Sequence, residues 1–189
     1  RSGENSLNSN QANFKNLKRL SVMKTISISP VPLTQKEFFE FGDVLEVKNR
    51  EHFLINDGMC KRYDRLSKVT ADNGVGQSSI SIFRGQPYSL PLTIKLLERH
   101  PLGSQAFMPL HPDPFLVIVA KDLSGKPTTP KVFFTNGVQG INIHANTWHG
   151  VLTPLFTECD FLVIDRVGPT LNLEEFNLIQ KTALRNVIS

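Results

Sequence analysis

The chain has 189 residues, a formal net charge of +4 and 40% hydrophobic residues, which suits one domain that buries a sizeable core without disulfides. Cys60 and Cys159 lie far apart without CxxC spacing, which argues against a thiolate zinc site and favours buried thiols in a reducing compartment. No apolar run approaches the roughly 20 residues that span a bilayer, and there is no zinc-finger spacing or basic helix. We therefore expect a soluble, cytoplasmic protein that binds neither membrane nor nucleic acid.

Residues 1–22 are rich in Asn and Ser and lack the apolar core of a secretory signal. We expect this segment to be an N-terminal extension, either native or added for expression, with Met23 as a candidate original start. The remainder, residues 23–189, is expected to form a single domain.

Residues 34–37 have the form of a capping box and predict a short helix from Gln35 to about Glu40, which Gly42 ends. Residues 43–48 are then expected to form a strand. The polar run at residues 60–64 favours a solvated loop, judged from residue type alone.

Residues 79–84 alternate in hydrophobicity and predict another strand, with Ile80, Ile82 and Arg84 on one face. Two interpretations of Arg84 stay open. Either this end of the strand is exposed to water, or the guanidinium projects into a pocket and holds a carboxylate.

Residues 93–100 predict a strand whose apolar face, Ile94 and Leu96, continues into Glu98 and His100. Because Pro101 cannot donate to a sheet ladder, the strand is expected to break there and resume over residues 104–110.

We expect these two strands to pair as a hairpin. The return strand would bring Gln105 back toward Glu98 and His100. Three groups able to bind a metal or a polar substrate would then converge at one end of a barrel.

Further short strands are predicted over residues 115–120, 131–135, 140–144 and 160–165, separated by turns rich in Gly and Pro. The first of these is continuously apolar and is expected to be buried on both faces. Many short strands with such turns indicate an all-β sandwich or barrel.

In the last segment, from Asn172 onward, the spacing of the apolar residues changes from that of a strand to that of a helix. Asn172 is placed to cap a helix, with Glu175 three residues on. Phe176, Ile179 and Ala183, together with Val187, then form one apolar stripe. We expect a C-terminal helix packed on the barrel or on a second subunit.

His144 and His149 flank the single tryptophan, Trp148. Their spacing of five places them on opposite faces of a regular strand, so different roles are expected for them. For each, a structural imidazole and a catalytic one are both open interpretations. His149 is the better candidate ligand because an apolar strand begins directly after it.

These motifs resemble the cupin superfamily and, within it, the ureidoglycolate lyase family. The resemblance is carried by residues 97–107 (LERHPLGSQAF), by TNG at 135–137 with Gln139 and Gly140, by Trp148-His149, and by 161–166 (FLVIDR). It spans residues 26–168 and implies a cupin-like β-barrel or jelly roll. With the two predicted helices, the expected fold is mainly all-β with a short N-terminal helix and a C-terminal helix.

The resemblance also implies a ligand set. Glu98, His100 and Gln105 resemble the first cupin motif with two ligands replaced, and His149 resembles the ligand of the second motif. A neutral Gln holds a cation less well than a carboxylate does. The site is therefore expected to hold either a divalent ion, such as nickel, zinc or manganese, or no metal.

The activity implied by the resemblance is cleavage of ureidoglycolate to glyoxylate and urea, a late step of allantoin and purine catabolism, by a homodimer. The substrate carries a carboxylate and a hydroxyl whose proton must be removed, while the departing urea nitrogen must gain one. The candidate catalytic residues are a base, His100 or Glu98, and a proton donor, His149 or His144. The candidate substrate-binding residues are Arg84, Arg62, Gln105 and Tyr63, with Lys48 as a weaker carboxylate ligand.

Three alternative functions stay open. A non-catalytic cupin would bind a small carboxylate or sugar without turnover. An amidohydrolase acting on the same substrate would release ammonia and carbon dioxide, whereas the lyase leaves urea intact. A basic barrel that binds nucleic acid would show binding that falls steeply with salt.

Overall fold

The computed structural model describes the backbone of residues 26–71 and 74–184 and the side chains up to residue 178. The predicted extension at residues 1–22, and Val187 of the predicted C-terminal stripe, lie outside the described residues. Among the residues that are described, no helix is long and apolar enough to cross a membrane.

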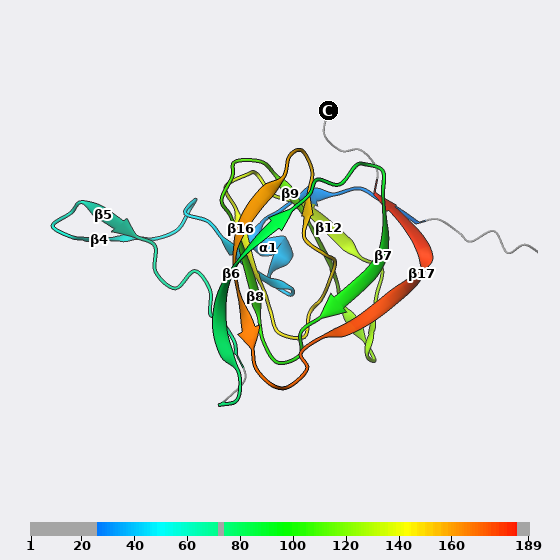
Figure 1. Ribbon diagram of the computed structural model, residues 1–189. Coiled ribbons are helices and arrows are strands. Elements are labelled where there is room, and N and C mark those ends of the chain that lie inside the picture. The colour runs from blue at the N-terminus through cyan, green and yellow to red at the C-terminus, as the bar shows by residue number, and fades with distance from the viewer. Residues whose placement is uncertain (1–25, 72–73, 185–189) are drawn as a thin grey trace, which may run out of the picture.

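Two sheets face each other and enclose the interior of a barrel-like sandwich (Figure 1). The larger sheet has eight strands, and the smaller one has five. In spatial order, the larger sheet consists of β1 (Ile26–Ile28), β17 (Glu174–Leu184), β7 (Leu92–Arg99), β14 (Trp148–His149), β9 (Phe115–Ala120), β12 (Lys131–Phe134) and β2 (Val31–Pro32), with β15 (Thr153–Pro154) also paired to β9. The smaller sheet consists of β3 (Gly42–Leu45), β13 (Gly140–Ile143), β8 (Gln105–Pro109), β16 (Cys159–Val167) and β6 (Gln77–Gly85).

The remaining elements are short. The helix α1 (Gln35–Phe38) begins at Thr34, whose Oγ1 accepts a hydrogen bond from the Glu37 amide at 3.3 Å. This confirms the predicted N-terminal cap and helix. Two hairpins complete the fold, β4 (Phe53–Ile55) with β5 (Cys60–Arg62) and β10 (Asp122–Leu123) with β11 (Lys126–Pro127).

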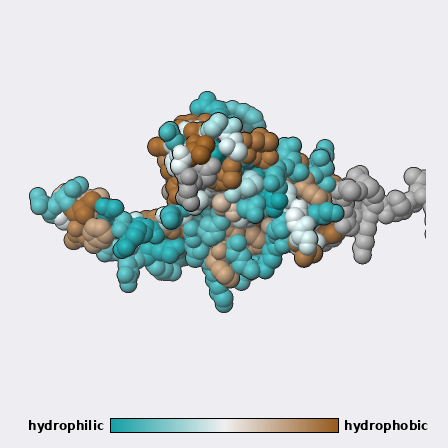
Figure 2. All heavy atoms as spheres, turned by 90° about the horizontal axis from the view of Figure 1, so that it is seen from below, coloured by the Kyte–Doolittle hydropathy of each residue, from teal (hydrophilic) through white to brown (hydrophobic). Residues whose placement is uncertain are grey.

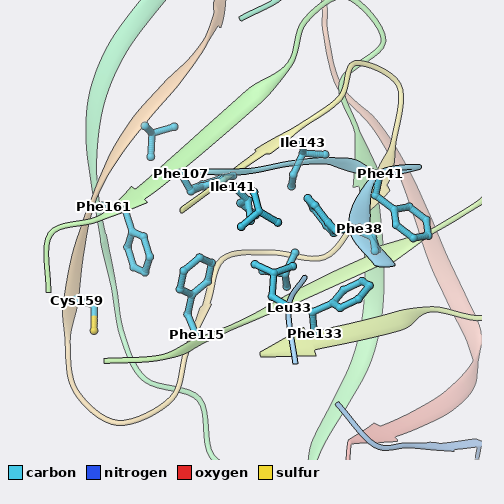
Figure 3. Packing of buried hydrophobic residues seen from close by; sticks show 14 residues of the cluster. Leu33, Phe38, Phe41, Phe107, Phe115, Phe133, Ile141, Ile143, Cys159 and Phe161 are labelled. Atoms are coloured by element: carbon cyan, nitrogen blue, oxygen red, sulfur yellow. The ribbon is translucent and has the colours of Figure 1, made fainter. Parts of the chain in front are cut away.

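The main core lies between the sheets. Alternate residues of β9, among them Phe115, face inward and pack against β16, where Phe161 is fully buried. The rings of Phe115 and Phe161 meet edge to face, 5.0 Å apart, and those of Phe38 and Phe133 meet in the same way at 5.5 Å (Figure 3). Aromatic side chains from both sheets and from α1 thus fill one interior.

The opposite face of β9 is buried as well. Leu116, Ile118 and Ala120 form a second apolar cluster with Trp148 and Leu97. Burial on both faces explains why this strand is continuously apolar, and it confirms the prediction for residues 115–120. The all-β class is confirmed too, and the strands predicted around residues 43–48, 79–84, 131–135, 140–144 and 160–165 are present with bounds that shift by up to three residues.

The prediction of a C-terminal helix is wrong. Residues 174–184 form β17, which pairs antiparallel with β7 and parallel with β1. Phe176 lies opposite Leu97 and packs against the second cluster, and the register shifts between Asn177 and Thr182. Because β7 offers an unpaired edge, a ladder of non-local hydrogen bonds outweighs a local preference for helix.

The predicted hairpin between residues 93–100 and 104–110 is also wrong. The two strands form as expected, but β7 pairs with β17 and β14, whereas β8 pairs with β13 and β16. The turn at Pro101 and Gly103 therefore carries the chain from one sheet to the other. A Cβ at Gly103 would lie 2.6 Å from the Arg166 Cβ, so this crossing requires glycine.

Residues 60–64 were expected to be a solvated loop, but residues 60–62 form β5 of a hairpin that projects from the barrel (Figure 1). Its turn uses Asn56, Asp57 and Gly58, all with positive φ. Met59 at the tip is 88% exposed. We call this hairpin, β4 with β5, the arm.

Cys60 lies on the arm and is exposed, so the expectation that both thiols are buried is wrong for Cys60 and right for Cys159. The Cys159 thiol donates to the Thr157 carbonyl at 3.1 Å, and burial raises the pKa of this thiol. We expect iodoacetamide to modify Cys60 readily in the folded protein and Cys159 only after unfolding, because the thiolate is the reactive form. Mass spectrometry of the labelled peptides measures both rates, and equal rates would contradict this burial.

Candidate functional site

Three candidate ligands converge inside the barrel. Glu98 precedes the last residue of β7, His100 follows that strand, and His149 belongs to β14, where it lies directly opposite Glu98. Their ligand atoms all lie within 4.8 Å of one another. The ring centroids of the two histidines are 5.1 Å apart.

Backbone carbonyls fix the tautomer of both histidines. His100 Nδ1 lies 2.7 Å from the Asn172 carbonyl, and His149 Nδ1 lies 3.0 Å from the Gly150 carbonyl. A carbonyl only accepts, so the Nδ1 atom of each ring carries a proton, and Nε2 is the ring nitrogen left to contact a ligand. Both Nε2 atoms are buried, and neither has a hydrogen-bond partner among the described residues.

Burial sets the charge of these groups. Desolvation lowers the pKa of His149 to about 4, so this ring is neutral near pH 7. Burial also raises the pKa of the Glu98 carboxyl; His100 lowers this pKa and Glu175 raises it further. The contact of 3.9 Å between Glu98 Oε1 and His149 Nδ1 therefore joins an acid to a neutral ring and is not an ion pair.

The residues fit a metal ion. Two imidazoles whose Nε2 atoms have no hydrogen-bond partner among the described residues, together with one carboxylate, are a ligand set that transition metals accept. An imidazole whose Nδ1 donates to a carbonyl is also the usual second-layer arrangement around a metal. The group Glu98, His100 and His149 is thus one that could hold a metal.

Two cavities meet at this group. One has a volume of about 520 Å³ and is lined by His100, Gln105 and Asp165. The other, of about 460 Å³, is lined by Glu98, Gln105 and His149. Gln105 therefore separates the two cavities.

Gln105 is buried at the start of β8. Its Nε2 lies 3.5 Å from Asp165 Oδ2, a long and weak hydrogen bond. Asp165 was not among the predicted site residues. The signal that points to it is its place in the FLVIDR run, two residues beyond Val163 on the inward face of β16.

Arg84 lines the smaller of these cavities, so both earlier interpretations hold in part. Its guanidinium makes a bidentate pair with Asp160 on the neighbouring strand, with Nε to Oδ1 at 2.7 Å and Nη2 to Oδ2 at 2.8 Å. The side chain is 63% exposed. Arg84 thus lies at the cavity edge, held by an acid.

Two other predicted substrate ligands lie on or beside the arm. Arg62 donates to Asp64 at 2.8 Å, and the Tyr63 ring lies 5.1 Å from that of His52. Neither residue lines the two cavities described above. The arrangement does not bring them to Glu98, His100 and His149.

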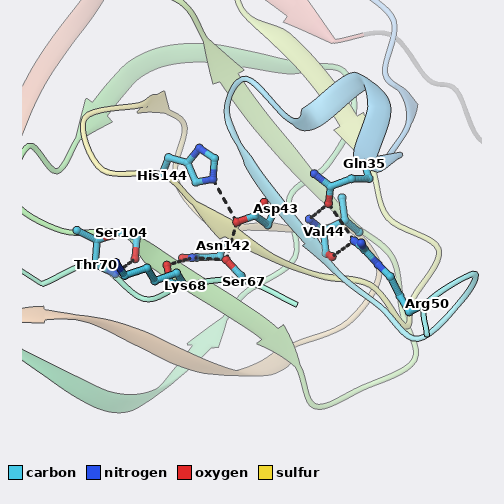
Figure 4. Close-up of polar contacts among 10 residues, drawn as sticks. All are labelled: Gln35, Asp43, Val44, Arg50, Ser67, Lys68, Thr70, Ser104, Asn142 and His144. Carbon is cyan, nitrogen blue, oxygen red and sulfur yellow. Dashed lines mark hydrogen bonds and ion pairs between the residues drawn. The ribbon is translucent and has the colours of Figure 1, made fainter. Parts of the chain in front are cut away.

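His144 lies in a polar network with Asp43 (Figure 4) and lines neither of the two cavities around Gln105. Its Nε2 lies 3.2 Å from Asp43 Oδ2, which also accepts from the Ser67 hydroxyl at 2.6 Å. Asn142, only 1% exposed, donates to the same hydroxyl and to the Lys68 carbonyl. This network fastens residues 67–68 to β3 and β13. Lys48 lies elsewhere again, in a third cavity.

Arg99 and Trp148, which adjoin Glu98 and His149 in the sequence, lie on the outer face of the larger sheet. With their acidic partners they form a cluster that we call the clamp. Arg99 lies 4.4 Å from the centroid of the Trp148 ring, donates to Glu174 at 2.8 Å and donates to Asp122 at 2.9 Å. Trp148 Nε1 donates to the same Asp122 at 2.8 Å. The clamp joins β7, β14 and β17, whose other face carries Glu98 and His149.

We expect Arg99→Leu to lower the free energy of unfolding by about 1–2 kcal/mol, through loss of the cation–π contact and of a pair held by a mostly buried side chain. Urea denaturation followed by the fluorescence of Trp148 measures this. Arg65→Leu is the matched control, because that side chain is 91% exposed and its ion pair is with Asp64, its neighbour in sequence. Equal stabilities for the two variants would show that the clamp contributes nothing.

Comparison with known proteins identifies the family of this chain. The ureidoglycolate lyase family model matches residues 25–185. The ureidoglycolate lyase of Chelativorans sp. (strain BNC1) is 54% identical over 145 residues, which cover 77% of this chain and 88% of the relative. Ureidoglycolate lyase 2 of Rhizobium meliloti (strain 1021) is 50% identical over 144 residues, covering 76% of this chain and 88% of that protein. The chain therefore belongs to the ureidoglycolate lyase family.

Proposed function

We propose that this protein is a ureidoglycolate lyase, which cleaves ureidoglycolate into glyoxylate and urea in allantoin and purine catabolism. Its family membership supports this. So does the single observation that carries the chemistry, a partly buried carboxyl with a raised pKa beside two imidazoles whose buried Nε2 atoms have no hydrogen-bond partner among the described residues. Two free thiols fit the reducing environment of a cytoplasmic enzyme.

The reaction needs one proton to move between two atoms of the substrate. The hydroxyl loses its proton, its electron pair forms the aldehyde C=O, the C–N bond breaks, and the urea nitrogen gains a proton. The His149 ring is neutral near pH 7 and its N–H group points at a backbone carbonyl, so this ring offers no proton to the cavity. In our proposal Glu98 takes the hydroxyl proton and returns it to the nitrogen, in place of the proton donor expected from the histidines.

Arg84 remains our candidate for the substrate carboxylate. It is a cation lining the cavity that contains Glu98, and its bonds to Asp160 use Nε and Nη2, leaving Nη1 outside that pair. A guanidinium nitrogen aimed at a carboxylate gives a strong, charge-assisted hydrogen bond. Gln105, between the two cavities, would orient the ureido group through its amide.

We also propose a divalent ion, held by Glu98, His100 and His149 with the Gln105 oxygen as a further ligand. Nickel, zinc and manganese all suit such nitrogen and oxygen donors. When bound, the ion would lower the pKa of a nearby hydroxyl. The chain itself supplies the two buried Nε2 atoms, which have no hydrogen-bond partner among the described residues.

The test is turnover of ureidoglycolate, with glyoxylate, urea and ammonia followed separately before and after chelation. We expect equal amounts of glyoxylate and urea, no ammonia, and loss of activity that added metal restores. Ammonia in place of urea would assign the amidohydrolase reaction instead. Substrate binding without any product would favour a non-catalytic cupin, and unchanged activity after chelation would remove the metal from the proposal.

We further propose a homodimer. The edge strand β6 exposes Ile80 and Ile82, 72% and 56% accessible, opposite Ile164 and Leu162 of β16. Figure 2 shows apolar atoms on the raised part of the surface and on the arm. An apolar sheet face at an open edge is typical of an interface. We expect a dimer in sedimentation at micromolar concentration, converted to monomer by Ile82→Glu; a wild-type monomer would contradict this.

A further inference from the structure

A third cavity lies apart from the candidate site. It has a volume of about 500 Å³ and shares no lining residue with the two cavities around Gln105. It is formed where β2 leads into α1, where residues 46–50 follow β3, and where β12 ends. It contains Lys48, Asn136 and Gln139, residues that the sequence singled out and the proposed reaction does not use.

One wall carries a guanidinium in a fixed position. Arg50 Nη2 donates to Gln35 Oε1 at 3.1 Å and to the Val44 carbonyl at 3.3 Å. The same Gln35 oxygen accepts from the Val44 amide at 2.8 Å, so α1 and β3 hold Arg50 together (Figure 4). These bonds use one of the three guanidinium nitrogens. A guanidinium held in this way is pre-oriented, and less side-chain entropy is lost when an anion binds.

A second positive charge lies beside it. Lys48 lines the same cavity and makes no hydrogen bond or ion pair with the residues that the structure describes. Asn49, between the two cations, adopts a left-handed conformation with φ of 57°. The chain thus turns sharply at this point, with both cations at the cavity.

Glu46, the acidic residue that lines this cavity, already accepts a hydrogen bond. Glu46 Oε2 accepts from Gln139 Nε2 at 3.0 Å, and Gln139 Oε1 accepts from the Asn136 amide at 3.2 Å. Neither Lys48 nor Arg50 pairs with this carboxylate in the described part of the chain. The cavity therefore presents two cations against one acid, over an apolar surface that includes Leu33 and Phe134.

We propose that this cavity binds a small organic oxyanion, either a carboxylate or a phosphate ester. The oxyanion lies between Lys48 and Arg50, and the carbon body rests on Leu33 and Phe134. Charge-assisted hydrogen bonds to a fixed guanidinium and a mobile ammonium supply the affinity. The site is distinct from the reaction centre, and its existence does not depend on the proposed lyase activity.

The experiment titrates the full chain with oxalate and, separately, with inorganic phosphate at constant ionic strength, while amide NMR shifts are followed. We expect saturable shifts at residues 46–50 and 136–139, resolved from any shifts at residues 98–100 and 148–150. Tighter binding of oxalate identifies a carboxylate as the ligand, and tighter binding of phosphate identifies a phosphate ester. Either result supports the site. The absence of saturable shifts at residues 46–50 with both probes would overturn it.

Lys48→Gln is the decisive variant, because this exposed side chain makes no hydrogen bond or ion pair with the described residues and its loss should leave the fold intact. We expect affinity to fall by about tenfold, as loss of one charge-assisted contact predicts. Lys126→Gln, on β11 and outside the cavity, is the matched control and should stay within about twofold. Equal affinities in the two variants would overturn the proposal. The NMR shifts do not depend on turnover. A negative turnover assay would therefore contradict the lyase proposal alone, and an absence of shifts would contradict the oxyanion site alone.

Discussion

Replacing His149 with alanine should reduce turnover of ureidoglycolate by a factor on the order of 10² to 10⁴, the range that a directly acting group contributes. The side chain supplies a neutral, buried Nε2 atom to the group formed with Glu98 and His100. Because alanine offers no lone pair, affinity for zinc or nickel should fall with it, by about 100-fold. Trp148, the single tryptophan, adjoins His149 and offers a fluorescence measurement of metal binding that needs no substrate.

His144→Ala is the matched control, since the sequence proposed both histidines for the same role. The His144 imidazole contacts Asp43 and lies outside both cavities, and the His144 side chain is 44% exposed. Turnover and metal affinity should therefore stay within about threefold of wild type, as expected for a group that touches no reactant. If His144→Ala instead loses turnover as fully as His149→Ala, the position of the site inside the barrel is wrong.

Phe161→Ala should lower the free energy of unfolding by about 3–5 kcal/mol, the usual cost of removing a buried aromatic ring from a packed core. The ring is fully buried on β16 and lies edge to face with Phe115 and with His111. Both contacts are lost, and a cavity remains between the sheets. Equilibrium denaturation in urea measures the change, with the slope checked for two-state behaviour.

Leu123→Ala serves as the control for this variant, because Leu123 is 68% exposed on β10. It should alter the free energy of unfolding by less than about 0.5 kcal/mol. If Phe161→Ala lowers the free energy of unfolding by less than about 1 kcal/mol, the ring is not packed between the two sheets.

Local patterns predicted core strands such as β9 and β16 well because at least one face of each must avoid water. The run at residues 115–120 is apolar throughout since both of its faces are buried. The convergence of Glu98, His100 and His149 was also predictable, since two of them alternate along one strand and the motif supplied the third. The pairing of β14 with β7, which places His149 opposite Glu98, is not visible in the local pattern.

Pairing between distant strands was what the sequence did not predict. Nothing local distinguishes a hairpin from a crossing at Pro101, because both need the same turn residues. The apolar positions of residues 176–183 suit a helical stripe as well as a strand with a bulge, and only the free edge of β7 decides between them. Arg62 and Tyr63, which the sequence offered as substrate ligands, lie on or beside the arm and away from the two cavities. Their polarity does not predict the direction in which the arm leaves the barrel.

The candidate site is divided between the two sheets. Glu98, His100 and His149 all come from β7, β14 or the residue that follows β7, in the larger sheet, whereas Gln105 and Asp165 come from the smaller one. Substitutions on β8, β16 or β6 would therefore reshape the space offered to a substrate without moving Glu98, His100 or His149. Protein engineering could change which substrates this scaffold accepts by redesigning the smaller sheet, while the three candidate ligands on the larger sheet stay in place.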